Sequence, residues 1–367
     1  MRVALRLGLS VQRVENGAAG PMGWKCAAVT RYASGVFRRR WVRYLFTLLA
    51  LGLGGGFLVR SVPWNDHCPG GAGMSTCARD ALVPGLRTVL ATMDGRLLAF
   101  GAAVYVLGAF FWALRWKCVL AVAPKPPRFG ALLRASMEAY AAMALFVGGV
   151  GGDALRLAAL MAEGIPAPWA AASLLVDRVI GLTALIVTAM VVAAPELMAL
   201  HPLAAVALPG LLVALVGGLG AGLVAPLPAF CPVKVRHVIE KLRGPYADVA
   251  ASRAIRGLAL SFAVSMLVAA ATLGSFGLFL AAAHSTPSSL AKLLVGLVEA
   301  FVVNAIPTVP GGWGTGEAVF VYFLKPAHID EAQALAASVA FRLSVFPVAL
   351  VGVVSLALRA RAKKTDR

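Results

Sequence analysis

Charged residues are scarce in this sequence. Only 14% of its 367 residues are Asp, Glu, Lys or Arg, whereas 60% are hydrophobic, and the mean hydropathy is +0.83. Soluble globular domains carry about 25% charged residues. This deficit excludes an ordinary soluble domain and predicts an integral, polytopic membrane protein.

Motifs that carry catalysis are also missing. The five histidines are scattered without an HExxH pair, and the sequence has neither a P-loop nor a nucleophile elbow. The string 149–152 is similar to a dinucleotide-binding loop, but it lies outside any soluble βαβ unit. The sequence therefore predicts no enzyme, no metal site and no cofactor.

The five cysteines show no metal-ligand spacing. Cys68 and Cys77 share one hydrophilic segment, where they would form a disulfide if that segment faces an oxidising compartment. Two free thiols fit the sequence equally well. Cys26, Cys118 and Cys231 lie in or near basic segments and are expected to stay reduced.

Basic residues outnumber acidic ones by 34 to 16, which gives a net charge of +18. Lys and Arg cluster beside apolar stretches, as in cytoplasmic loops that face anionic lipid, so we expect no nucleic-acid partner. Two basic tails, 1–43 and 359–367, flank a membrane domain at 44–358. Both termini are therefore predicted on the cytoplasmic side of the cytoplasmic membrane.

Long apolar stretches predict an all-α fold with about six transmembrane helices. They occupy residues 44–60, 97–114, 168–193, 203–227, 257–283 and 332–358. The polar segment 61–94 suits an external loop, and the basic loop 232–256 suits the cytoplasmic side.

Two glycine-rich motifs indicate an internal repeat. The motifs Gly148–Arg156 and Gly311–Ala318 each run through several glycines to one acid that is followed by Ala. In each copy an arginine follows the acid 25 positions later. This shared spacing predicts duplicated units at about 129–193 and 290–358.

Each unit begins with an apolar stretch that its glycine motif interrupts. The halves of 129–163 and 290–324 are mostly shorter than the roughly 20 residues that cross a bilayer. The charge bias places both ends of the first stretch inside and both ends of the second outside. We therefore predict two oppositely oriented re-entrant helical hairpins that form an inverted repeat, with a cavity at their glycine tips near the midplane.

The acid and arginine of each unit have two candidate roles. Asp153 and Glu317 would stand at the start of the returning half-helices, where free backbone N–H groups stabilise a carboxylate. Arg178 and Arg342 lie ten residues into their helices, which is about 15 Å deep. Each acid either neutralises its arginine and joins hairpin to helix, or the two arginines face one central cavity and bind a ligand.

Further polar residues favour a ligand role. Arg156 and Asp177 add charge that one ion pair does not need, and Asn304 either lines the cavity or makes a helix-end contact. Several arginines in a buried cavity fit a phosphate-bearing headgroup, because guanidinium matches phosphate oxygens bidentately. The candidate substrate-binding residues are Asp153, Arg156, Asp177, Arg178, Asn304, Glu317 and Arg342.

These motifs resemble the lysylphosphatidylglycerol synthase transmembrane (flippase-like) family. The resemblance rests on Gly148–Arg156, the pair at 177–178, the stretch Asn304–Glu317 and Arg342, and it covers about residues 40–360. It implies an inner-membrane domain with re-entrant hairpins that moves or binds a lipid. In fused members a cytosolic aminoacyl-transferase domain follows. Here the chain ends nine residues after the last predicted span, so we expect no synthase activity.

The leading hypothesis is a non-enzymatic lipid translocase or lipid-binding transporter. Its ligand would be an anionic, phosphate-bearing membrane lipid, either a phospholipid or a polyprenyl phosphate. An alternative is a non-catalytic accessory subunit whose partner is a membrane enzyme of glycan or lipid biosynthesis. A third hypothesis is a membrane-embedded transferase that uses the midplane carboxylates.

Overall fold

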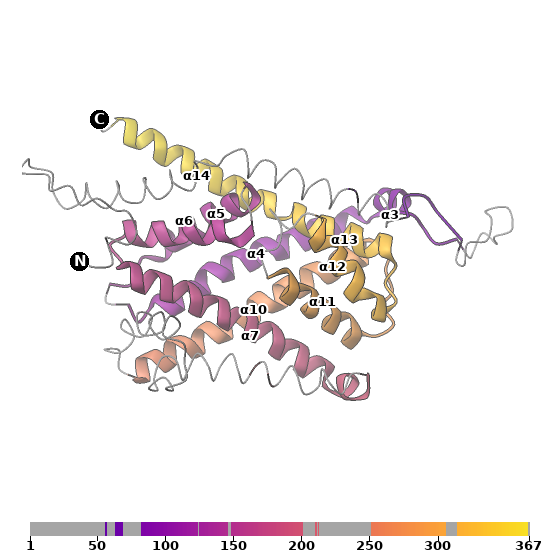
Figure 1. The fold of residues 1–367 in the computed structure, drawn as a ribbon. Coiled ribbons are helices and arrows are strands. Elements are labelled where there is room, and N and C mark those ends of the chain that lie inside the picture. Colours follow the sequence, from indigo (N-terminus) through magenta and orange to yellow (C-terminus); the bar gives the residue numbers. More distant parts are fainter. Residues whose placement is uncertain are drawn as a thin grey trace, which may run out of the picture. The chain divides into compact units, whose positions relative to one another are not determined.

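The fold is helical throughout the part of the chain that the structure describes (Figure 1). A computed structural model describes residues 63–68, 82–123, 125–145, 148–200, 251–305 and 314–365, and the single positions 56, 210 and 212. All of them belong to one compact unit, Ala50–Arg367. Apart from an isolated bridge between His67 and Val83, every regular element in these ranges is a helix, which confirms the predicted all-α class.

The described helices keep the order in which the sequence analysis expected them. They are α3 Leu86–Thr92, α4 Gly95–Leu120, α5 Phe129–Leu145, α6 Gly148–Ala162, α7 Ala167–Leu200, α10 Ala251–Ala282, α11 Leu290–Asn304, α12 Thr315–Leu324, the 3-10 turn η5 Lys325–Ala327, α13 Glu331–Leu343 and α14 Val345–Thr365.

Four helical segments are long and apolar enough to cross a membrane. They are Gly95–Leu120, Ala167–Val191, Arg256–Ala282 and Glu331–Arg359. They match four of the predicted spans, and the chain is a multi-pass membrane protein. The predicted spans 44–60 and 203–227 lie outside the described residues except at the three single positions, so the total of six stays a prediction.

Helices α4 and α10 pack side by side along their lengths. Asp94 caps the start of α4, and its side chain accepts a hydrogen bond from the backbone N–H of Arg96 at 2.7 Å. Glycines on α4 allow the close approach: a methyl group at Gly101 would lie 2.7 Å from the Phe279 ring. The backbone N–H of Asp94 donates to the carbonyl of Ala282 at 3.0 Å, so α4 begins where α10 ends.

Helices α5 and α6 form the first hairpin. At its open end, Leu132 and Leu160 are buried in one cluster with Leu120 at the end of α4. Toward its tip, Gly152 packs so closely on α5 that a methyl group there would lie 2.7 Å from Met143. The two arms are therefore antiparallel, and the hairpin opens at the C-terminal end of α4.

Helices α11 and α12 form the second hairpin. At its open end the backbone N–H of Ser288 donates to the carbonyl of Ala327 at 2.9 Å. Near its tip the Asn304 side-chain amide lies 3.4 Å from the carbonyl of Gly316. This open end follows directly after α10, at the end of the bundle where α4 begins. The two hairpins therefore open at opposite ends of the α4–α10 pair, which is the geometry an inverted repeat requires.

The glycine motifs differ from their predicted form. Gly148–Gly152 forms the first turns of α6 and does not interrupt the chain before a helix starting at 153. The motif packs closely on α5 at Gly152, where a methyl group would lie 2.7 Å from the Met143 side chain and 3.1 Å from the carbonyl of Ala139. In the second motif Gly314 precedes α12 with φ of 83°, a backbone conformation that favours glycine.

The last predicted span, 332–358, is divided into α13 and α14 at Ser344. Pro347 explains the break, because proline offers no N–H to the carbonyl of Leu343 and its ring crowds that carbonyl. Helix α14 then packs on α5 of the first hairpin, and α7 of the first unit packs on α11 of the second. The two repeat units are therefore interlocked.

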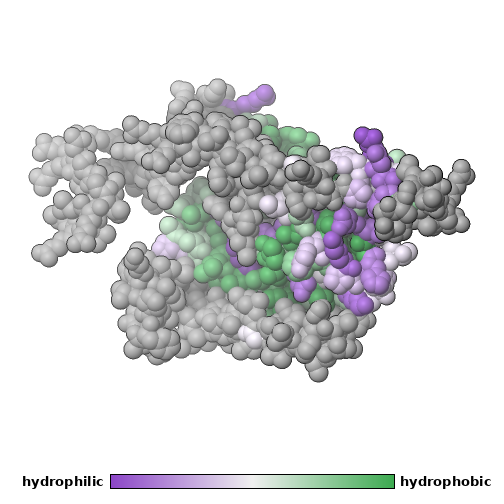
Figure 2. Space-filling view, turned by 45° about the vertical axis from the view of Figure 1, so that its right-hand side comes forward, coloured by the Kyte–Doolittle hydropathy of each residue, from purple (hydrophilic) through white to green (hydrophobic). Residues whose placement is uncertain are grey.

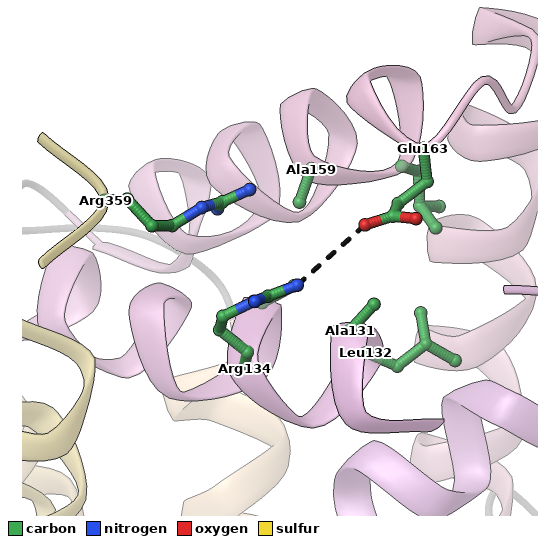
Figure 3. A pocket seen from close by; sticks show the side chains of 8 residues that line it. Ala131, Leu132, Arg134, Ala159, Glu163 and Arg359 are labelled. Atoms are coloured by element: carbon green, nitrogen blue, oxygen red, sulfur yellow. Dashed lines mark ion pairs between the residues drawn. The ribbon is translucent and has the colours of Figure 1, made fainter. Parts of the chain in front are cut away.

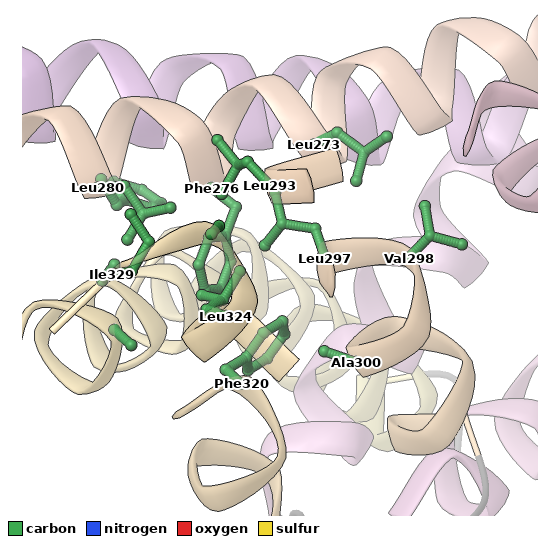
Figure 4. Close-up of a cluster of buried hydrophobic side chains, with 14 of the residues drawn as sticks. Leu273, Phe276, Leu280, Leu293, Leu297, Val298, Ala300, Phe320, Leu324 and Ile329 are labelled. Atoms are coloured by element: carbon green, nitrogen blue, oxygen red, sulfur yellow. The ribbon is translucent and has the colours of Figure 1, made fainter. Parts of the chain in front are cut away.

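An aromatic core holds the second hairpin on α10 (Figure 4). Phe276 lies at its centre, 4.5 Å from the Phe320 ring and 6.0 Å from the Phe301 ring between centroids. Hydrophobic residues also cover a broad part of the visible described surface (Figure 2). Exposed apolar side chains such as Phe100 and Leu350 suit helices that face lipid.

Candidate functional site

The first predicted acid–arginine pair is formed. The Nε–H of Arg178 on α7 donates to Asp153 Oδ2 on α6 at 2.9 Å, and Nη2 of the same guanidinium pairs with that oxygen. The exposed fractions of the two side chains are 49% for Arg178 and 27% for Asp153. The pair therefore joins the returning arm of the hairpin to the next helix while one side of the guanidinium stays accessible.

A second carboxylate lies deeper between two arginines. Asp177 accepts from Arg115 Nε at 2.7 Å and from Arg115 Nη2 at 3.0 Å, which is a bidentate pair. It also accepts from Nη1 and Nη2 of Arg156, each at 3.2 Å. Arg156 Nη1 lies 3.9 Å from Asp153 Oδ1. We call the alternating series Arg115, Asp177, Arg156, Asp153 and Arg178 the charge ladder.

The charge ladder runs from the protein interior to an accessible end. The side chains of Arg115, Asp177 and Arg156 have exposed fractions of 7%, 1% and 1%. Because the ladder holds three arginines and two aspartates, one positive charge has no negative partner within it. It links α4, α6 and α7, and its accessible end is Arg178.

Two tryptophans enclose the middle arginine of the ladder. Cζ of Arg156 lies 4.3 Å from the Trp112 ring centroid and 3.9 Å from the Trp116 ring centroid. Trp116 donates from Nε1 to Ser173 Oγ at 3.3 Å, which fixes its indole. The guanidinium is therefore held between two π-faces by cation–π contacts. The candidate binding role of Arg156 stays a prediction, and its guanidinium contacts Asp177 and the two indoles.

Sequence reasoning missed the contribution of α4. The predicted span 97–114 ends just before Arg115, whereas α4 continues to Leu120. The spacing of Trp112, Arg115 and Trp116 places all three on one helix face. That spacing was the available signal, because an arginine between two tryptophans on one face indicates a buried guanidinium.

The second acid–arginine pair is formed as well, in a closed setting. Glu317 on α12 pairs with Nε of Arg342 on α13, and its Oε2 accepts from the backbone N–H of Gly314 at 2.5 Å. The carboxylate therefore stands at the start of its helix, as predicted. The same prediction is wrong for Asp153, which is the sixth residue of α6. Gly316 packs against both the Arg342 guanidinium and the Asn304 side chain.

A line of aromatic contacts connects the two sites. Trp112, which stacks on Arg156, lies 5.0 Å from Tyr140, and Tyr140 lies 6.4 Å from Tyr105, between ring centroids. Tyr105 in turn lies 5.0 Å from Phe341, the residue before Arg342. Tyr105 and Trp112 are two turns apart on α4, so one face of this helix borders both sites.

A pocket lies at the open end of the first hairpin, between α5, α6 and α14 (Figure 3). Arg134 and Arg359 line it, and Arg134 Nη2 lies 3.9 Å from Glu163 Oε1. Arg359 also pairs with the buried Glu138 at 3.2 Å, a contact that the sequence analysis did not foresee. This pocket is not the predicted midplane cavity. The hairpin tips, 146–147 and 306–313, lie outside the described residues, so that cavity stays a prediction.

The cysteine predictions have a partial outcome. Cys68 is disulfide-bonded, and its predicted partner Cys77 lies outside the described residues. Cys118 carries a free thiol, as expected. Within the described ranges, no group of three His, Cys, Asp or Glu side chains is placed to hold a metal ion.

Together these features define a multi-pass helical membrane protein with polar residues gathered at two opposed hairpins. Its sequence matches the family model described as Lysylphosphatidylglycerol synthase TM region over residues 72–352. The match covers more than half of the chain, which therefore belongs to this family. No curated protein sequence matches the chain.

Proposed function

We propose that this protein binds and translocates an anionic, phosphate-bearing membrane lipid. The observation that carries the proposal is the charge ladder, which has one unmatched positive charge and ends at the accessible Arg178. A charge at membrane depth is costly, so such residues normally pair with one another or serve a substrate pathway. The family membership supports a role at the membrane.

The geometry suggests how Arg178 would bind a phosphate. Asp153 occupies the Nε and Nη2 edge of the guanidinium, so a lipid phosphate would bind on its exposed side or displace Asp153. Arg115 and Asp177 hold α4 and α7 together below this contact. The ligand would therefore bind to an arginine that these ion pairs already hold in position.

The opposed hairpins support transport over binding alone. In inverted-repeat transporters the substrate site lies near the midplane at the repeat interface, beside broken helices. Here the two hairpins open at opposite ends of the α4–α10 pair, and each unit's last helix packs on the other unit's hairpin. We propose six spans with two re-entrant hairpins and cytoplasmic termini in the cytoplasmic membrane, acting without catalysis.

Reconstitution into liposomes tests this function. Labelled phosphatidylglycerol and a labelled polyprenyl phosphate are followed across the bilayer, with wild type compared with Arg178→Gln and Arg178→Lys. We expect the Gln variant to lose about tenfold or more in rate, and the Lys variant to lose less because it keeps the charge without the planar fork. Arg134→Gln is the matched control, since Arg134 has an exposed fraction of 45% and lies outside the ladder.

The alternative functions give different results in the same assay. A covalent product formed from a lipid donor would identify a membrane-embedded transferase. A wild-type protein that transports neither lipid but co-purifies with a biosynthetic enzyme would identify an accessory subunit. Either result would replace the translocase proposal.

A further inference from the structure

We infer that the charge ladder selects lipids whose headgroup is a phosphodiester with one net negative charge. It would favour them over zwitterionic lipids and over dianionic phosphomonoesters. This inference rests on the proposed function, because it names the substrate class of the same site. It is carried by the charges and burial of the five ladder residues.

The charges around the site do not balance. Three arginines face two aspartates in the ladder, so it carries one excess positive charge. Two other acids of the first hairpin are paired outside the ladder: Glu138 on α5 with Arg359, and Glu163 just after α6 with Arg134. Within the described ranges, the excess charge therefore belongs to the ladder itself.

The ladder cannot easily change its charge. Arginine does not lose its proton in proteins. Arg156 is enclosed by Trp112 and Trp116, with an exposed fraction of 1%, so counterions and water reach it poorly. The ligand at Arg178 is therefore the group that completes the charge balance, because charges in a low-dielectric setting are weakly screened.

Lipid headgroups differ in the net charge that they would bring to the ladder. A phosphodiester with no other charge brings one negative charge and makes the occupied site neutral. A zwitterionic headgroup leaves the positive excess in place. A phosphomonoester carries about −1.5 to −2 at pH 7 and overcompensates it. Since Asp153 takes one edge of the Arg178 fork, only a single phosphate finds donors there.

The experiment varies the ladder charge while the lipid charge is varied in parallel. Arg115→Gln lowers the excess from one to zero at the buried end, far from the ligand, and Asp153→Asn raises it to two. Arg115→Lys keeps the charge, and Arg134→Gln removes an arginine outside the ladder. Purified full-length proteins bind a fluorescent phosphatidylglycerol, which is competed with unlabelled phosphatidylglycerol, phosphatidylcholine and phosphatidic acid.

The measured quantity is the ratio of affinities for the three competitors. A variant that is only partly folded lowers all three affinities together and leaves their ratios unchanged. We expect wild type, Arg115→Lys and Arg134→Gln to favour phosphatidylglycerol by about tenfold or more. Asp153→Asn should shift the preference toward phosphatidic acid, and Arg115→Gln should bind phosphatidylcholine as well as phosphatidylglycerol.

The failure of this inference differs from the failure of the proposed function. Charge selection would be overturned if the affinity ratios are the same in Asp153→Asn, wild type and Arg115→Gln. The proposed lipid transport would not be affected by that result. If Arg115→Gln does not fold, the Asp153→Asn shift decides by itself. Wild-type protein that binds none of the three lipids would overturn this inference. The proposed function would fall with it only if the protein also transports neither phosphatidylglycerol nor the polyprenyl phosphate in liposomes.

Discussion

The two predicted repeat units place the same acid–arginine spacing in different surroundings. In the first unit Asp153 and Arg178 form the accessible end of the charge ladder, with exposed fractions of 27% and 49%. In the second unit Glu317 is fully enclosed, and the side chain of Arg342 has an exposed fraction of 18%. The repeat therefore keeps the contact that joins hairpin to helix, while the access to that contact differs.

This difference favours unequal roles for the two units. The Glu317–Arg342 pair is matched in charge and also caps α12 through Gly314, so it suits a structural role. The Asp153–Arg178 pair belongs to a series with an unmatched cation, so it suits a ligand. The following variants test whether burial and charge, rather than position in the repeat, decide these roles.

The largest effect is expected at the buried end of the ladder. Asp177→Ala leaves Arg115 and Arg156 buried without their shared carboxylate, which should cost about 3–5 kcal/mol of unfolding free energy. Asp153→Ala should cost only about 1 kcal/mol, because its arginine is half exposed. SDS-induced unfolding in mixed micelles measures both. If the two substitutions cost the same unfolding free energy, burial does not determine how much each ion pair of the ladder contributes to stability.

The enclosed pair of the second unit should show strong coupling. Glu317→Ala removes the buried carboxylate that pairs with Arg342 and should cost about 3 kcal/mol, whereas removing both side chains should relieve much of that cost. The matched cycle with Asp153→Ala and Arg178→Ala should show coupling below about 1 kcal/mol. The double variant of the first unit should fold yet fail to bind lipid. If that double variant still binds lipid fully, Asp153 and Arg178 do not bind the ligand and their role is structural.

The glycines beside the two pairs should respond differently to a methyl group. At Gly316 it would lie 1.9 Å from the Arg342 guanidinium and 2.9 Å from Asn304 Oδ1, so Gly316→Ala should cost about 1–3 kcal/mol. At Gly152 its nearest neighbour is the flexible Met143 side chain at 2.7 Å, and the cost should be smaller. Gly274→Ala is the control, because nothing lies within 4 Å. A larger loss at Gly152 would reverse the comparison.

Sequence reasoning identified both pairs because their information is local. The 25-residue spacing appears twice, and hairpins of similar length bring Asp153 and Glu317 to their arginines in both units. The all-helical class and four spans followed from apolar stretches of membrane length. These features need no knowledge of how distant helices pack.

The missed features all depend on packing between distant segments. Arg115 reaches Asp177 across 62 positions, and Arg359 reaches Glu138 across 221. Arg115 lies just beyond the predicted span 97–114 and Arg359 begins the predicted basic tail, although each reaches a buried carboxylate. The first glycine motif is helical and packs on α5 at Gly152, which helix propensity does not reveal.

The smallest effect is expected at Asp66, a carboxylate outside the membrane-spanning helices. Like Glu317, it accepts a hydrogen bond from the backbone N–H of a glycine. The backbone N–H of Gly85 donates to Asp66 Oδ1 at 2.7 Å, much as that of Gly314 donates to Glu317. This hydrogen bond lowers the pKa of Asp66 below its ordinary value of 3.8, with a smaller contribution from Thr88.

Because the folded pKa is lowered, the contribution of Asp66 to stability is present above the ordinary aspartate pKa. It should be lost as the pH falls below about 4 and through the folded value. Asp66→Asn should remove this part of the pH dependence and change little above pH 5. Unfolding midpoints measured from pH 6 to pH 3 for both proteins check the difference. If the unfolding midpoints of wild type and Asp66→Asn stay parallel below pH 4, the hydrogen bond from Gly85 does not stabilise the ionised carboxylate. The comparison between Asp66 and Glu317 would then fail.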